Sequence, residues 1–127
     1  AITEEEKADE DSKIGDAFTI AEFVMGVNET TEADLPETVL AWDFVRAVNM
    51  ARWAFICGYI NEDEMWEAIR TTAGIAKESF NSWEEYGNSF AVGRGIWRGE
   101  TDDYETADEV VGALLNKEDS PWKAIEW

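Results

Sequence analysis

Hydrophobic positions recur along most of the chain at intervals of three and four residues, which is the spacing of one face of an α-helix. The first such run covers about 14–27, with Ile14, Phe18, Ala21 and Met25 on its inner side. No stretch shows the sustained alternation that is typical of a half-buried strand. The pattern therefore predicts an all-α chain whose first long helix occupies residues 14–27.

The most apolar part of the chain is the segment 36–59, PETVLAWDFVRAVNMARWAFICGY. Its apolar side chains would cover more than one side of a helix, and a helix of that kind is normally buried by its neighbours. Pro36 has the preset backbone angle of a first helical residue, and Gly58 is a suitable stop. We expect this segment to be the buried central helix of a bundle.

Polar residues with helix-starting properties divide the rest of the chain. Asn61 with Glu64, and Ser82 with Glu85, have the three-residue spacing of a capping box. The helices expected from these starts and from apolar periodicity run from Asn61 to about Phe80, over 83–98 and over 104–116, with a short turn after Ser120 and Pro121. Together they predict an irregular all-α bundle of about five helices around the segment 36–59, with the aromatic side chains in its core.

The domain organisation follows from length and local composition. A chain of 127 residues is enough for one domain of ordinary size. Residues 1–13 are strongly acidic and are expected to be frayed, whereas 14–127 is expected to form a single helical domain with short connections.

The net charge of −19 comes from 29 acidic and 10 basic residues. It argues against nucleic acid and against anionic membrane surfaces, because both need a basic face. It leaves a basic protein as the expected macromolecular partner. The candidate partner-binding residues are Glu4, Glu5, Glu6, Asp9, Glu100, Asp102, Asp103 and Glu105. High acid content with little Lys also suits a halophilic host, in which case the acidity would belong to a structural domain.

The residue types that carry most enzyme chemistry are missing. The chain has no His, so Ser-His and Cys-His pairs are excluded, and zinc sites nearly so. Its single cysteine, Cys57, lies in an apolar run and is interpreted as a small core residue. We therefore expect no catalytic residues, no metal and no cofactor. The cysteine content, with no signal peptide and no long apolar run, favours a cytoplasmic location.

Polar residues interrupt the most apolar segment at regular intervals. Asp43, Arg46, Asn49 and Arg52 follow one another at three-residue steps, and Arg94 lies between Gly93 and Gly95 in a later helix. The two glycines would let another helix approach closely. One interpretation is an anion pocket in which the arginines converge. The other, which we favour, is an interhelical network in which Asp43 pairs with arginine and fixes the helix register.

Several motifs occur in one order: W-D-x-x-R-x-x-N-x-x-R at 42–52, G-Y-I at 58–60, F-x-S-W-E-E-Y at 80–86, G-R-x-x-W at 93–97 and S-P-W at 120–122. In this order they resemble the bacterial domain of unknown function 1266 family, over about residues 36–127. The resemblance implies a bacterial, cytoplasmic protein of a family without an established activity, and it leaves 1–12 outside the matched region. The positions that match it are Trp42, Asp43, Arg46, Asn49, Arg52, Ser82, Trp83, Gly93, Arg94, Trp97, Ser120, Pro121 and Trp122.

Three functional hypotheses remain from the sequence. The first is an acidic protein-interaction domain, for example an immunity or antitoxin-like partner of a basic protein. The second is a sensor of a small anionic ligand that uses the Arg and Asn side chains, and the third is a halophile-type structural domain. An enzyme that uses only carboxylates and arginines is the least supported, because it needs an acid with a raised pKa in a cleft.

Overall fold

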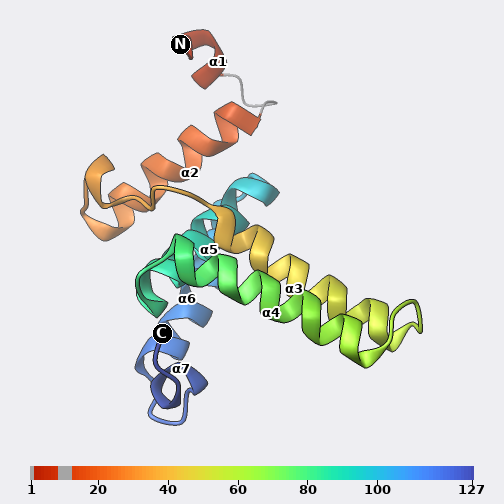
Figure 1. Ribbon diagram of the computed structural model, residues 1–127. Coiled ribbons are helices and arrows are strands. Elements are labelled where there is room, and N and C mark those ends of the chain that lie inside the picture. Colours follow the sequence, from red (N-terminus) through yellow and green to blue (C-terminus); the bar gives the residue numbers. More distant parts are fainter. Residues whose placement is uncertain (1, 9–12) are drawn as a thin grey trace.

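The fold was analysed in a computed structural model, which describes residues 2–8 and 13–127 apart from the side chain of Glu6. The helices in chain order are α1 (Glu4–Ala8), α2 (Lys13–Asn28), the 3-10 turn η1 (Glu32–Asp34), α3 (Leu40–Ile56), α4 (Glu62–Ser79), α5 (Trp83–Arg98), α6 (Thr101–Asn116) and α7 (Pro121–Ala124). The described residues contain no strand, so the predicted all-α class is confirmed (Figure 1).

The predicted capping residues begin the helices assigned to them. The Asn61 side chain accepts a hydrogen bond from the Glu64 amide, and the Glu64 carboxylate accepts one from the Asn61 amide, which completes the capping box of α4. Ser82 accepts from the Glu85 amide in the same way. α5 ends at Gly99, whose φ of 69° lies in the left-handed region that favours glycine.

The predicted start of the second long helix at Pro36 is wrong, because α3 begins at Leu40. A tertiary contact sets this start. The hydroxyl of Ser89, a buried residue of α5, accepts a hydrogen bond from the Ala41 amide at 3.2 Å and donates one to the Thr38 carbonyl at 2.7 Å. A side chain 48 residues away in the sequence therefore satisfies an amide that a local cap would otherwise have to satisfy.

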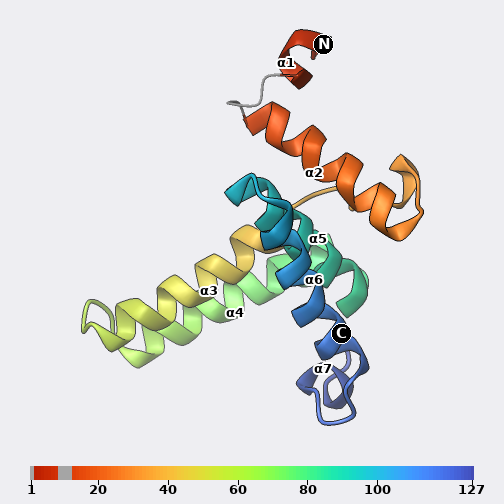
Figure 2. The same cartoon turned by 180° about the vertical axis from the view of Figure 1, so that it is seen from behind.

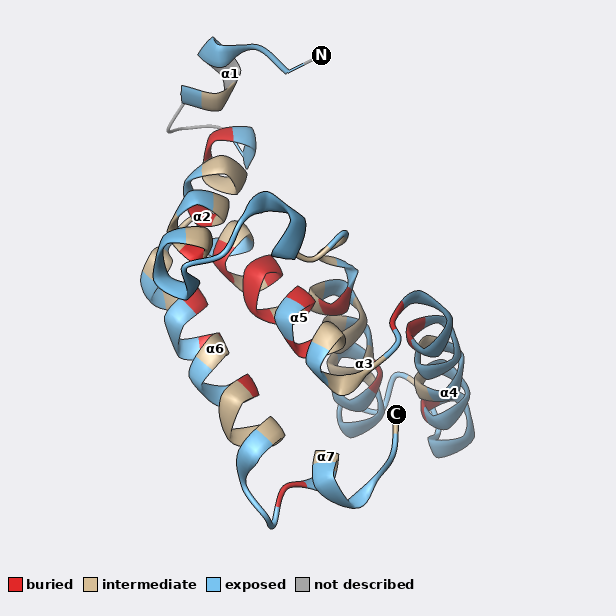
Figure 3. Cartoon of the chain, turned by 90° about the vertical axis from the view of Figure 1, so that its left-hand side faces the viewer, coloured by how far each residue is buried: buried red, intermediate tan, exposed pale blue. Residues whose placement is uncertain are grey.

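The central helix of the fold is α5, and the prediction that the segment 36–59 is central and buried is wrong. Figure 3 shows buried residues concentrated along α5. α5 packs against α2, α3 and α6, and its buried residues are Gly87, Ser89, Ala91, Val92, Gly93 and Gly95. Small residues let three helices approach one helix. In α3, by contrast, only the small residues Ala41 and Ala51 are buried.

α3 and α4 pair with each other and project from the rest of the molecule as a helical hairpin (Figures 1 and 2). Since α5 covers only the first part of α3, the far part of the hairpin has no third helix against it. Large apolar side chains are consequently exposed there, with Trp53 at 60%, Ile56 at 75% and Tyr59 at 84% of full exposure.

Two further expectations fail for the same reason. Cys57 is exposed at the hairpin end and is not a core residue. The seven tryptophans do not fill the core either: all are only partly buried or exposed. The main buried cluster consists of small and aliphatic residues with Tyr104, among them Ile20, Ala91 and Val111, and Phe80 is buried outside this cluster. Among the described residues, no helix is long and apolar enough to cross a membrane.

Candidate functional site

The most distinctive surface feature lies where the hairpin leaves the core, between α3 and α5. It is an open cavity of about 640 Å³, which we call the aromatic–arginine groove. Its lining residues are Trp42, Val45, Arg46, Asn49, Met50, Trp53, Phe90, Arg94 and Trp97. Three indoles, a phenyl ring and two guanidinium groups therefore face one space.

Arg46 is held between two indole rings at the centre of this groove. Its guanidinium carbon lies 4.4 Å from the centroid of the Trp97 ring and 5.7 Å from that of Trp42. Guanidinium groups are attracted to the negative face of an indole and keep their N–H groups free at the edge while they stack. Among the described residues, Arg46 has no carboxylate within ion-pair distance. It is therefore a positioned cation whose charge no nearby acid compensates.

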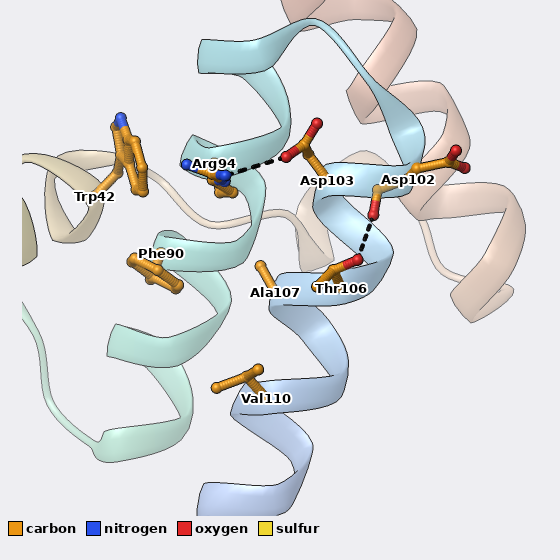
Figure 4. Close-up of a pocket in the computed structure, with 8 residues that line it drawn as sticks. All are labelled: Trp42, Phe90, Arg94, Asp102, Asp103, Thr106, Ala107 and Val110. Carbon is orange, nitrogen blue, oxygen red and sulfur yellow. Dashed lines mark hydrogen bonds and ion pairs between the residues drawn. The ribbon is translucent and has the colours of Figure 1, made fainter.

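Arg94 also lies close to Trp42, and unlike Arg46 it has an ion-pair partner among the described residues. Its guanidinium carbon lies 5.2 Å from the centroid of the Trp42 ring, and its Nη2 lies 3.2 Å from Oδ1 of Asp103. Arg98 adds a longer contact, with Nε 3.6 Å from the other oxygen of Asp103. Figure 4 shows Arg94 between Trp42 and Asp103, at the edge of a second cavity of about 340 Å³ between α5 and α6.

The spacing along α3 explains which predicted polar residues reach the groove. With about 100° of rotation per residue, positions 42, 46, 49 and 53 fall within a narrow sector of one helix face. Each three-residue step drifts back by about 60°, so Asp43 and Arg52 end on opposite sides of the helix. Arg46 and Asn49 accordingly line the groove with Arg94, whereas Asp43 and Arg52 are exposed and form no ion pair with a described residue.

The favoured network in which Asp43 pairs with arginine is therefore wrong. The partner of Arg94 is Asp103, the first-turn carboxylate of α6, which we had assigned to the acidic partner surface. Gly93 does have the predicted role, since a Cβ there would lie 2.6 Å from the Trp42 Cβ. The missing Cβ lets α3 lie close to α5 at Trp42, whose ring is near both arginines.

One polar atom in the groove wall has no partner. The indole Nε1–H of Trp42 is buried and donates no hydrogen bond to any other described residue. A buried donor without an acceptor costs the folded chain free energy.

The described members of the predicted acidic set lie on α1 and around the start of α6. Glu4 and Glu5 lie on α1, where Glu4 pairs with Lys7 at 2.9 Å. Glu100, Asp102 and Glu105 are exposed around the start of α6, whereas Asp103 is only partly exposed because of its contacts to arginine. Asp9 and the Glu6 side chain lie outside what the structure describes.

A separate polar pocket of about 260 Å³ lies on the other side of α5, toward α2. Burial, and secondarily the neighbouring Glu109 carboxylate, raise the pKa of Asp108 in its wall. Burial also raises the pKa of Tyr104, whose hydroxyl accepts a hydrogen bond from Asn28 at 3.3 Å. An acid with a raised pKa in a cleft is what the carboxylate-enzyme hypothesis requires. The pocket lining contains a second carboxylate, Asp34, whose pKa is lowered by hydrogen bonds from Thr31, and it contains no arginine.

Sequence reasoning missed the aromatic members of the groove. The sequence analysis expects Trp42 and Trp53 in the core. Their helical spacing places them on the same face of α3 as Arg46 and Asn49, and this spacing could have indicated that they line the same groove. Sequence reasoning also missed Lys13, whose Nζ donates to the carbonyl oxygens of Ile96 and Trp97 and so caps the end of α5. No local pattern indicates this contact, because 84 residues separate Lys13 from Trp97.

The geometry defines an all-α domain with an open aromatic–arginine groove and an exposed apolar hairpin. The chain belongs to the family described as "Protein of unknown function (DUF1266)", whose model matches residues 1–127. The resemblance seen in the motifs is thus confirmed, and its expected limit at residue 36 is wrong because the match includes the acidic start. No curated protein and no solved structure gave a significant match to the chain.

Proposed function

We propose that this chain is a protein-interaction domain that binds a net-basic partner through the α3–α4 hairpin. The observation that carries the proposal is the exposed apolar end of the hairpin. Met50, Trp53, Ile56 and Tyr59 are all more than half exposed there. Exposed apolar groups gathered in one place are typical of an interaction surface, and Trp and Tyr are enriched among residues that dominate binding energies.

The charge of the chain supports a basic partner. A net charge of −19 repels other acidic proteins, including a second copy of this chain, and attracts basic ones. Glu100, Asp102 and Glu105 are exposed and form no ion pair with a described residue, so they are available to a partner. Electrostatic attraction of this kind raises the association rate, while the apolar contact slows dissociation.

The proposal is tested by capture from a lysate of the native host at low salt, with a salt step and mass spectrometry of the eluate. A single basic protein is expected, in stoichiometric amount. Ile56→Ser should lower its affinity about tenfold, because burying an isoleucine contributes about 1.5–3 kcal/mol. Val27→Ser is the matched control, since Val27 is an exposed aliphatic residue on α2 and capture should be unchanged.

A separate variant tests how much the acidic residues contribute to partner binding. Replacing Glu100, Asp102 and Glu105 with lysine should slow association and reduce the salt dependence of capture. Capture that is indifferent to Ile56→Ser and to this triple variant, or a partner that is itself acidic, would refute the proposed function.

A further inference from the structure

We propose that the aromatic–arginine groove is a binding site for a monoanion with a flat apolar body, whose carboxylate is held by Arg46. The site is distinguishable from the partner surface proposed above, because Ile56 and Tyr59 belong only to the hairpin end, whereas Met50 and Trp53 belong to both.

The charge of the ligand follows from the two arginines in the groove. Arg94 already has an ion-pair partner in Asp103, which it shares with Arg98. Arg46 lies over the Trp97 ring and has no carboxylate within ion-pair distance among the described residues. A guanidinium edge matches the two oxygens of a carboxylate. The one guanidinium of the groove that lacks an ion-pair partner therefore fits one carboxylate.

The shape of the ligand follows from the rest of the lining. Trp42, Trp53, Trp97 and Phe90 surround the space with flat apolar faces, and Asn49 adds one amide. Indole faces are best covered by another flat group. The cavity of about 640 Å³ is within the size range of small-molecule sites, roughly 300–1,000 Å³. An aromatic ring system with one acidic group satisfies both sets of contacts.

Two further features bear on the site. Trp42 offers a ligand its ring and not its N–H, because the Nε1 atom is buried. The net charge of −19 opposes any anion at long range. At physiological salt, however, charges beyond about 8 Å are largely screened, so the groups lining the groove decide the affinity.

The test uses 2-naphthoate as the probe and 2-naphthamide as its neutral counterpart, with affinities measured by calorimetry. The indole N–H resonances report where each probe binds. Arg46→Gln should weaken 2-naphthoate by about 10- to 100-fold, because a hydrogen bond to a charged group is lost. It should leave 2-naphthamide nearly unchanged. Arg52→Gln is the control, since Arg52 is an exposed arginine on the same helix that does not line the groove.

A second variant guards against a folding defect. Arg46→Lys keeps the positive charge but loses the planar fork, so it should bind 2-naphthoate more weakly than the wild type and more tightly than Arg46→Gln. Ile56→Ser should leave 2-naphthoate binding unchanged, which separates this site from the proposed partner surface.

The same chemistry can come from a free aromatic acid or from the C-terminal aromatic residue of a peptide. A short peptide that ends in Trp with a free carboxylate, compared with its C-terminal amide, distinguishes the two sources. Arg46-dependent binding of 2-naphthoate alone identifies a free acid, and Arg46-dependent binding of the peptide acid identifies a chain terminus. If neither acid binds, or if Arg46→Gln and Arg52→Gln weaken 2-naphthoate equally, the site does not exist as proposed.

Discussion

The α2–α5–α6 core and the α3–α4 hairpin contain similar apolar side chains and bury them to different extents. Ile20 of the core is 0% exposed, whereas Ile56 of the hairpin is 75% exposed. The core helices meet around the small residues of α5, where each apolar side chain finds neighbours on several sides. The far parts of α3 and α4 pack mainly against each other. Apolar content alone therefore does not make a segment central; the number of helices that can reach it does.

The largest expected effect separates the two regions by stability. Ile20→Ala removes a fully buried side chain and should lower the free energy of unfolding by about 2–5 kcal/mol. Ile56→Ala should change it by less than about 0.5 kcal/mol, because its side chain is mostly in water in the folded chain. Urea denaturation with unchanged slopes measures both. Equal losses would mean that the hairpin end is covered in solution.

The next effect concerns the close approach of α3 to α5. Gly93→Ala should destabilise the chain by about 3 kcal/mol, since the new Cβ would lie 2.6 Å from the Trp42 Cβ and 3.1 Å from the Val39 carbonyl oxygen. Gly74→Ala in the hairpin meets nothing within 4 Å and should stabilise it by about 0.5–1 kcal/mol. Thermal unfolding would show shifts of opposite sign, and a neutral Gly93→Ala would mean that the helices are farther apart.

Ser89 joins the two regions and gives a smaller effect. Ser89→Ala leaves the Ala41 amide and the Thr38 carbonyl without their partner and should cost about 2 kcal/mol. Ser79→Ala is the hairpin counterpart, because the Ser79 hydroxyl bonds only to the exposed Ile75 carbonyl within its own helix. Its expected cost is below about 0.5 kcal/mol. Hydrogen exchange at the Ala41 amide should rise in the Ser89 variant alone.

The smallest effect depends on pH. Burial and the Glu109 carboxylate raise the pKa of Asp108, so its ionisation is harder in the folded chain than in the unfolded one. The resulting penalty is absent at low pH, where both states are protonated, and is present above the folded pKa. Asp108→Asn should therefore stabilise the chain more at about pH 7 than at about pH 3. Glu67→Gln removes the same charge from an exposed hairpin position and should show a smaller difference between the two pH values.

The helices themselves were largely readable from the sequence. Asn61, Ser82 and Ser120 start α4, α5 and α7 as predicted, because a cap acts on amides two or three residues away and needs nothing else. The predicted interval 83–98 agrees with α5 to the residue. The close contact at Gly93 was also predicted. Gly93 lies against α3 as expected, because a glycine in a helix lets a neighbouring helix approach closely.

The start of α3 and the composition of the groove could not be predicted from the sequence in this way. α3 starts where Ser89 bonds to it, and Arg94 pairs with Asp103 instead of Asp43. Arg46 and Arg94, two of the three arginines singled out from the sequence, line the groove, but the rings and the acid that contact them come from three different helices. The three-residue repeat suggested that the polar residues form one row along α3. The rotation of the helix instead places the first and last of them, Asp43 and Arg52, on opposite sides.

The sequence by itself determined the all-α class, most helix boundaries, the acidity and the close contact at Gly93, because each depends on residues near one another in the chain or on composition. Tertiary structure alone decided which helix is central, which apolar face stays exposed, and that Arg46 lies between Trp42 and Trp97 without an acid. The physical reason is that burial and pairing depend on which helices meet, and α5, through its small side chains, admits three neighbours.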